Sequence, residues 1–150
     1  MRTIVPGYGI LAAALATVSG AATAAPATPV AVVQHHVEAM KRGDLPAIMR
    51  DYAPDAVVIA PHGLVAGVTG RGAQVFVGSA SARRVFATLT DKAHHPGVVT
   101  MQTAIEPGGP GVALLHWVQF NGTAKQVSGE DVFVVRGGRI VHQAILAGAE

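Results

Sequence analysis

Hydrophobic and polar positions recur with helical spacing in the first part of the chain. Val33, Val37 and Met40 follow one another at steps of four and three residues, so their side chains share one face of a helix. This pattern predicts a helix over residues 30–42, and Gly43 is expected to end it.

Two further helices are predicted from capping residues and apolar spacing. Asp44 is a suitable N-cap and Pro46 falls in the first turn, where its missing N–H costs nothing, so a short helix is expected over residues 45–52. The apolar positions between residues 73 and 89 predict a longer third helix. Gly78 is the weak point of that helix, because glycine is a poor helix former.

The C-terminal part of the chain has the short apolar runs that are typical of strands. Strands are predicted at residues 57–60, 98–105, 112–120, 125–136 and 139–146, with a turn at 53–56 before the first. Asn-Gly at 121–122 and Gly-Gly at 137–138 are signals of two-residue hairpins, so the last strands should form an antiparallel meander. This order predicts an α+β fold, in which a curved antiparallel sheet wraps around about three N-terminal helices and encloses a cone.

The first residues have the features of a secretory signal peptide. Arg2 precedes a mostly apolar stretch, and Ala22 to Ala24 form an A-x-A cleavage signal. We therefore expect a signal peptide at residues 1–24, a Pro- and Ala-rich linker at 25–29 and one domain at 30–150. The expected location is periplasmic or secreted. An uncleaved N-terminal anchor is the alternative, but Pro6 and Gly7 interrupt the apolar stretch.

Charge and cysteine content narrow the classes of function. Without Arg2 the mature chain has ten basic side chains (11 − 1) and nine acidic ones, so the net charge is nearly balanced despite a pI near 9.4. The two basic doublets, Lys41–Arg42 and Arg83–Arg84, lie apart from aromatic residues, so no nucleic-acid partner is expected. No membrane partner is expected after signal cleavage. The absence of cysteine excludes disulfides, thiolate metal sites and a cysteine nucleophile.

Two stretches carry a resemblance to a known family. "GDLPAIMRDYAPDAVVIAPHG" followed by "GVTGRG", and later "GEDVFVVRGGRIVHQAI", resemble the nuclear transport factor 2-like superfamily, especially its SnoaL-like and ketosteroid-isomerase-like branch. The resemblance implies a cone-shaped barrel with an apolar pocket, commonly in a homodimer. Members include isomerases, polyketide cyclases, a dehydratase and non-catalytic binding domains, so the fold alone does not choose an activity.

Ketosteroid isomerase can be compared with this chain residue by residue. The resemblance places the isomerase's general-base aspartate at Ala60, its first-helix tyrosine at His36 and its protonated aspartate at Ser128. Because alanine at position 60 cannot act as a general base, the chain lacks proton abstraction at this position, which contributes a factor of about 10² to 10⁴ to the reaction rate. Steroid isomerisation by the family mechanism is therefore not expected.

The same resemblance predicts the polar residues of the pocket. It directs His36, His116, Ser128, Glu130 and Gln143 into the pocket and puts His62 near its mouth. A carboxylate beside a histidine in an apolar cavity is a plausible acid–base pair, because burial raises the pKa of the carboxyl and the negative charge keeps the imidazole protonated. On this interpretation Glu130 points inward and Asp131 outward, with Glu130 and His116 as the proton-transfer groups.

A strict two-residue turn at 121–122 gives a different register. It would pair His116 with Val127, so that His116 would share its face with Asp131 instead of Glu130. Asp131 therefore stays an alternative to Glu130. Trp117 should lie on the sheet face opposite His116 and is a candidate anchor of a dimer interface.

Two functions follow from these residues. The first is a cofactor-independent isomerase, cyclase or dehydratase that acts on a small apolar carbonyl compound, with His36 or Ser128 donating to developing negative charge. The second is a non-catalytic periplasmic or secreted module that binds a small apolar ligand or dimerises. No metal and no cofactor are expected, because no set of histidines has metal-ligand spacing and no nucleotide-binding glycine motif occurs.

Overall fold

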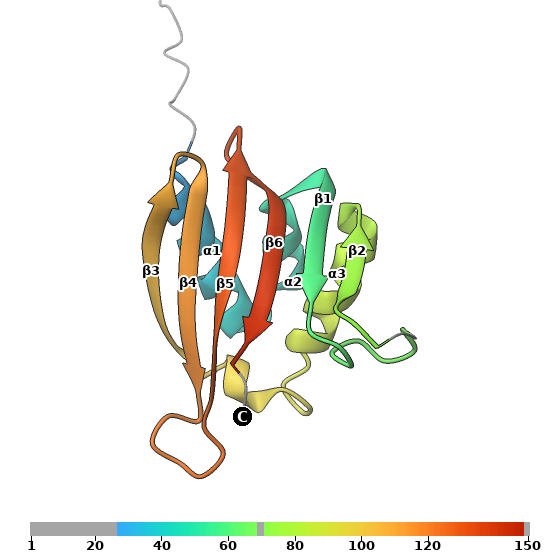
Figure 1. Cartoon of the computed structure of the whole chain (residues 1–150), viewed down its shortest axis with the longest axis vertical. Coiled ribbons are helices and arrows are strands. Elements are labelled where there is room, and N and C mark those ends of the chain that lie inside the picture. The colour runs from blue at the N-terminus through green and yellow to red at the C-terminus, as the bar shows by residue number, and fades with distance from the viewer. Residues whose placement is uncertain (1–26, 69–70, 149–150) are drawn as a thin grey trace, which may run out of the picture.

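The computed structural model describes residues 27–68 and 71–148 (Figure 1). The predicted signal peptide, 1–24, lies outside the described residues, as do residues 25 and 26 of the predicted linker. Thr28 ends that linker by capping the first helix, since its hydroxyl oxygen accepts a hydrogen bond of 3.2 Å from the N–H of Ala31.

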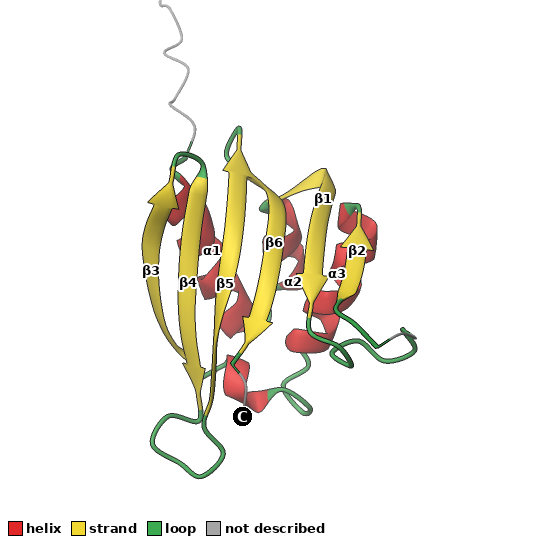
Figure 2. Cartoon of the chain, viewed as in Figure 1, coloured by secondary structure: helices red, strands yellow, loops and turns green. Residues whose placement is uncertain are grey.

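Three α-helices cover one face of a single sheet, as Figure 2 shows. They are α1 (Pro29–Arg42), α2 (Leu45–Arg50) and α3 (Ser79–Leu89), and a short 3₁₀ helix, η1 (Pro96–Val98), follows α3. Gly43 ends α1 in the left-handed conformation at φ 73°, as its position in the sequence predicts. Asp44 caps α2 by accepting from the N–H of Ala47 at 3.0 Å.

The six strands form one curved, unclosed sheet in the order β2-β1-β6-β5-β4-β3 (Figure 1). Their bounds are β1 (Tyr52–Ala60), β2 (Gln74–Val77), β3 (Gln102–Gly109), β4 (Val112–Gln119), β5 (Val127–Arg136) and β6 (Arg139–Ala147). The predicted α+β fold is confirmed. The sheet is mixed, however, because β1 pairs with β6 in parallel while the other pairs are antiparallel.

The predicted third helix over residues 73–89 is partly wrong. Residues 74–77 form β2, an edge strand whose side chains alternate between buried and exposed, and only the part after Gly78 is helical. Gly78 has a φ of 82°, which breaks the pattern at the position that the sequence marks as weak. The short apolar run at residues 75–77, made of β-branched and aromatic residues, was therefore a strand signal.

The predicted turn at 53–56 is also wrong, because these residues belong to β1. The register of β1 against β6 shifts between Tyr52 and Val57, so the strand carries an irregularity where the sequence favours a turn. Tyr52, predicted as the end of a helix, instead begins this strand and pairs with Ile140.

Of the two predicted two-residue hairpins, one is confirmed. Arg136 pairs with Arg139 across Gly137 and Gly138, both at positive φ. The turn at 121–122 is wrong, because Gln119 pairs with Val127 and residues 120–126 form a longer loop. Side chains close that loop locally; for example, the Gln126 oxygen accepts from the N–H of Gly122 at 2.9 Å.

The hydrophobic core lies between the helices and the inner face of the sheet. Its largest fully buried apolar side chains include Ile48, Phe86, Phe133 and Ile140, each of which stabilises the fold by about 2 kcal/mol through burial. Among residues 27–68 and 71–148, no helix is both long and apolar enough to cross a lipid bilayer.

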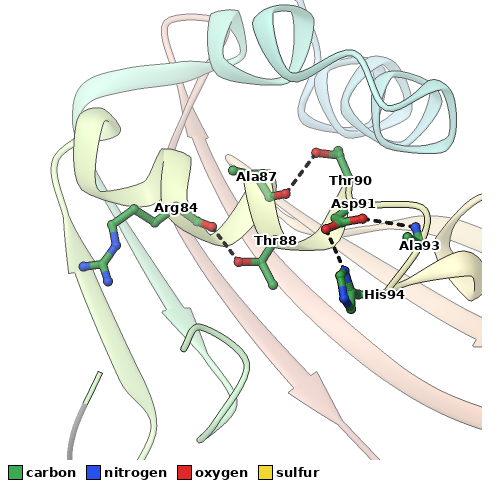
Figure 3. Close-up of polar contacts among 7 residues, drawn as sticks. All are labelled: Arg84, Ala87, Thr88, Thr90, Asp91, Ala93 and His94. Carbon is green, nitrogen blue, oxygen red and sulfur yellow. Dashed lines mark hydrogen bonds and ion pairs between the residues drawn. The ribbon is translucent and has the colours of Figure 1, made fainter. Parts of the chain in front are cut away.

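Local hydrogen bonds occur within the last turns of α3 and in the turn that follows it (Figure 3). The Thr88 hydroxyl donates to the carbonyl of Arg84 at 3.0 Å, and Asp91 accepts from the N–H of Ala93 at 3.1 Å. The Asp91 carboxylate also contacts the exposed imidazole of His94 at 2.8 Å. The next residue, His95, lines a cavity between the sheet and the helices.

Candidate functional site

A cavity of about 490 Å³ lies between the inner face of the sheet and the helices. This volume is within the range of small-molecule sites. Its walls come from α1, the loop after β1, the end of α3 with η1, and strands β4 to β6. The apolar part of the lining includes Val37, Met40, Leu64, Phe86, Leu89, Val98, Met101, Leu115 and Ile145, and the polar part consists of His36, His62, His95, Trp117, Gln119, Asp131 and Gln143.

The strand register directs Asp131 into this cavity. Asp131 pairs with Leu115 of β4 and Ile145 of β6, two apolar residues that face the core. Cross-strand partners share one face of a sheet, so the three side chains point inward together. Asp131 is only 6% exposed.

Two neutral donors hold the Asp131 carboxyl. The indole Nε1–H of Trp117 donates to Oδ1 at 2.9 Å, and the amide Nε2 of Gln143 donates to Oδ2 at 2.8 Å. Each oxygen therefore has one fixed hydrogen bond, which sets the plane of the carboxyl against the cavity wall. Both donors are uncharged side chains.

The orientation of the Gln143 amide is fixed by Tyr52. The Tyr52 hydroxyl donates to Gln143 Oε1, which turns the NH₂ end of the amide toward Asp131. Burial keeps the hydroxyl protonated, because it raises the pKa of Tyr52 well above its ordinary value. The chain Tyr52–Gln143–Asp131–Trp117 thus links β1, β6, β5 and β4 across the inner face.

Burial gives Asp131 unusual acid–base properties. Desolvation raises its pKa to about 6, although the hydrogen bonds from Trp117 and Gln143 act in the opposite direction by stabilising the carboxylate. A carboxyl that titrates near neutral pH inside an apolar cavity can both accept and return a proton.

His36 is the other buried ionisable group in the cavity lining, and it is neutral. Burial, with a smaller contribution from neighbouring His35, lowers its pKa to about 3. The ring packs edge-on against three aromatic rings, those of Tyr52, Phe86 and Phe133, at 5.3–5.6 Å between centroids. Its Nδ1 is buried without a hydrogen-bond partner among the described residues. Of the two consecutive histidines only this one faces inward, whereas His35 contacts the Asp51 carboxylate at 2.8 Å.

The prediction that Glu130 and His116 face the pocket is wrong. Glu130 pairs with His116 on β4, as the family comparison suggests, but this pair lies on the outer face of the sheet. Their side chains are 43% and 45% exposed, and His116 Nδ1 lies 3.8 Å from the Glu130 carboxylate. The nearer partner of His116 is Glu106 at 3.0 Å, and this hydrogen bond raises the pKa of the imidazole.

Ser128 shares the outer face with Glu130 and does not line the cavity. The two remaining predicted binding residues do line it: Gln143 from β6 and His62 from the loop after β1. The register derived from a strict two-residue turn is wrong as well, since it paired His116 with Val127. Asp131, the alternative to Glu130, is the acidic residue that lies inside.

A sequence signal for this orientation was available. Asp131 alternates with Phe133, and a large aromatic residue in a half-buried strand marks the buried face. The same alternation places Trp117 beside Leu115 on the inner face of β4. Trp117 is therefore opposite His116, as predicted, and its indole N–H binds Asp131 inside the cavity.

Sequence reasoning missed Tyr52 altogether. It was assigned to the end of a helix, and no local pattern links it to Gln143, which lies 91 residues away in the chain.

The part of the chain that the structure describes contains no candidate metal site. No group of three or more His, Asp or Glu side chains within residues 27–68 and 71–148 could hold a metal ion.

The chain matches the model of the SnoaL-like domain family over residues 33–143. No functionally curated protein matches it. Solved structures that it resembles include a nuclear transport factor 2-like protein of unknown function from Mesorhizobium loti. That protein is 15% identical with a TM-score of 0.57, and the match covers 79% of this chain and 88% of the other.

Two further similar structures have provisional functional descriptions. A protein from Sinorhizobium meliloti, provisionally described as a polyketide cyclase, is 21% identical with a TM-score of 0.53, covering 76% of this chain and 92% of that one. A Kribbella flavida protein, provisionally described as a ketosteroid isomerase, is 12% identical with a TM-score of 0.57, covering 81% and 78%. At these identities the likeness shows the fold alone.

Helices on one face of a curved sheet, with a cavity between them, are the nuclear transport factor 2-like fold. Within that fold class, the chain belongs to the SnoaL-like domain family.

Proposed function

We propose that this protein is a cofactor-independent enzyme that moves a proton on a small, apolar, carbonyl-bearing molecule bound in the cavity. The observation that carries the proposal is the Asp131 carboxyl, buried in the cavity wall, held by Trp117 and Gln143, and titrating near pH 6. A general acid–base group works best when its pKa is close to the working pH.

The proposed step is a proton transfer at carbon. The Asp131 carboxylate takes a proton from a C–H next to the substrate carbonyl, and the C–H electron pair moves into the carbonyl to give an enolate. Protonated Asp131 then returns the proton at the same or another atom. Isomerases, aldol cyclases and dehydratases share this step.

His36 is the proposed polar contact for the ligand. Because its imidazole is neutral, it can donate one N–H to a carbonyl oxygen as negative charge develops there. Ser128, the other predicted donor, has no part in this proposal because it lies on the outer face. His62 and Gln119 supply polar groups elsewhere in the lining.

The test begins with a thermal-shift screen of apolar ketones and continues with proton exchange. Each ketone that binds is incubated with the protein in D₂O, and deuterium at the carbon next to the carbonyl is measured by NMR. We expect the wild-type protein to catalyse exchange. Asp131→Asn should reduce the rate at least about 10²-fold while ketone binding persists.

Glu130→Gln is the matched control. It changes the adjacent carboxylate in the same way, but on the outer face, and should leave the exchange rate within about twofold. Equal loss in both variants would contradict the role of Asp131.

A second function, ligand binding without catalysis, is favoured by a different observation. Both Asp131 oxygens already accept hydrogen bonds. A polar network that is satisfied in this way is also what a protein needs to orient a bound ligand and to stabilise its fold, without any catalysis. The missing base at Ala60 agrees with this alternative. Ketones that bind tightly but exchange no deuterium in the presence of wild-type protein would support it.

Export is part of the proposal because of the leader-like residues 1–24. If the leader is cleaved after Ala24, the mature protein begins at Ala25. Expression of the full chain in a Gram-negative host, followed by mass spectrometry of the periplasmic and cytoplasmic fractions, tests this. A full-length mass in the cytoplasm alone would contradict export.

We also propose a homodimer formed through the outer face of the sheet. Paired residues continue one apolar row across that face: Val75, Ile59, Ala144, Val132 and Leu114. Val75 and Leu146 are 59% and 50% exposed. Large apolar patches on a sheet face favour burial against a partner of the same kind.

A further inference from the structure

The indole of Trp117 lies against the backbone of Gly129. Gly129 and Trp117 are directly paired across β5 and β4. Asp131 follows two residues along β5 on the same face, so the indole reaches its carboxyl diagonally.

A side chain at position 129 would not fit beside this indole. A Cβ built on Gly129 would lie 2.3 Å from Cζ2 and 2.7 Å from Cε2 of Trp117, well inside van der Waals contact. It would also lie 2.3 Å from the carbonyl oxygen of Leu146 on β6. Both neighbours of Gly129 therefore use the space that its missing side chain leaves.

We propose that Gly129 and Trp117 act as a pair of positioning residues: Gly129 provides the gap in which the indole lies, and the indole N–H in turn holds and polarises the Asp131 carboxyl. The inference deepens the proposed function, on which its catalytic meaning rests. The positioning itself can be tested without any turnover.

Loss of the indole N–H should have a definite electrostatic consequence. That hydrogen bond stabilises the carboxylate and so opposes the effect of burial. Without it, Asp131 would hold its proton to higher pH. The pair thus sets the pH at which the cavity contains a free base.

The positioning role of Gly129 and Trp117 can be tested by measuring the pKa of Asp131 from the carbon-13 NMR signal of its carboxyl in a pH titration. Trp117→Phe keeps an aromatic ring but removes the donor, and we expect it to raise the pKa of Asp131 by about one unit. Gly129→Ala should shift the pKa in the same direction by displacing the indole. In the Trp117→Phe background, Gly129→Ala should add no further shift.

The single tryptophan of the chain provides a second readout in the unmodified protein. Its indole N–H resonance should titrate with the same midpoint as the Asp131 carboxyl. Gly72→Ala is the matched control, since a Cβ at Gly72 meets nothing within 4 Å, and it should leave both signals unchanged.

Several results would overturn the inference. One is an unchanged pKa of Asp131 in Trp117→Phe, and another is an indole signal that does not follow the carboxyl. If Gly129→Ala folds but leaves both the pKa of Asp131 and the indole signal unchanged, the role of Gly129 toward the indole is refuted. Failure of the proposed function is separate: either the wild-type protein would catalyse no exchange or Asp131→Asn would retain it, whatever the titrations show.

Discussion

His36 of α1 and Asp131 of β5 are a buried base and a buried acid in the lining of one cavity, and burial shifts the pKa of each so that its neutral form is favoured. Burial lowers the pKa of His36 from 6.5 to about 3 and raises that of Asp131 from 3.8 to about 6. Between these limits both groups are uncharged in the folded protein. The apolar cavity thus contains no fixed charge from this pair at mildly acid pH.

The two groups have opposite effects on stability between about pH 4 and 6. The unfolded chain protonates His36 below pH 6.5 and the folded protein does not, so its contribution to stability falls as the pH is lowered. The folded protein holds the Asp131 proton up to pH 6 and the unfolded chain releases it near 3.8, so this contribution is lost as the pH rises. In the wild-type protein the two slopes largely cancel.

Substitution of Asp131 should reveal how the free energy of unfolding depends on pH through His36 alone. The wild-type protein loses stability as the buried Asp131 carboxyl ionises with rising pH, and the asparagine variant does not. Relative to wild type, the free energy of unfolding of Asp131→Asn should therefore rise by about 3 kcal/mol between pH 4 and pH 7. Urea denaturation at several pH values measures this. A constant difference between the two proteins would contradict a raised pKa for Asp131.

His36→Leu should show the opposite trend. Relative to wild type, its free energy of unfolding should fall by about 3 kcal/mol between pH 4 and pH 6.5. At pH 7 the variant should fold with near wild-type stability, because the Nδ1 atom that it removes is buried without a partner among the described residues. A loss above about 3 kcal/mol at pH 7 would indicate a structural hydrogen bond at His36.

The ionisation of Asp131 should also determine how the rate of proton exchange depends on pH. If Asp131 acts as the base, its ionised form is required, so kcat/KM for deuterium exchange should rise tenfold per pH unit below about pH 6 and level off above it. A profile that is flat between pH 4.5 and 8 would exclude Asp131 as the base.

At the scale of elements, the loop after β1 depends on one side chain of β2. The buried amide of Gln74 accepts from the N–H of Val65 at 2.9 Å and donates to its carbonyl at 3.0 Å, which imitates a strand pairing. Leu64 and His62, both in the cavity wall, belong to the same loop. The strand that sequence reasoning took for a helix therefore holds part of the cavity in place.

Gln74→Ala should loosen this loop. Two buried backbone groups of Val65 would lose their partner, which should cost about 1–3 kcal/mol and accelerate hydrogen exchange at the Val65 amide. Gln126→Ala removes an exposed amide that bonds only to the N–H of Gly122 and should cost under about 0.5 kcal/mol. Similar effects of the two variants would refute a specific role for Gln74.

At the scale of the whole molecule, the two faces of the sheet have different compositions. The inner face carries the core and the cavity, and the outer face combines apolar rows with the polar group Glu106, His116 and Glu130. Burial of that outer face between two copies would remove exposed valine and leucine side chains from water.

Leu146→Asp tests the proposed dimer. Placed beside Glu130 on the outer face, the new carboxylate should oppose association and convert a dimer to a monomer in sedimentation equilibrium. Val99→Asp changes an exposed apolar residue outside the sheet and should leave the mass unchanged. A wild-type protein that sediments as a monomer at millimolar concentration would exclude the dimer.

The sequence by itself determined the fold class and most helix and strand positions, and the resemblance added the inward direction of His36. Helical periodicity, the caps at Asp44 and Gly43 and the Gly-Gly hairpin are local features, and local physics is sufficient to predict them. The resemblance also identified Gln143 and His62, both of which line the cavity.

The alternation of Asp131 with Phe133 favours Asp131 as the inward carboxylate, but it competes with the register implied by the resemblance, and the tertiary structure decided between them. A shift of one residue in register or face exchanges Glu130 and Asp131, and the length of the 120–126 loop cannot be read from the Asn-Gly signal. The packing of Leu115 and Phe133 against the core settles the face, and contacts distant in sequence, from Trp117, Gln143 and Tyr52, then create the environment of Asp131. An ionisable group acquires its pKa from neighbours that only folding brings together.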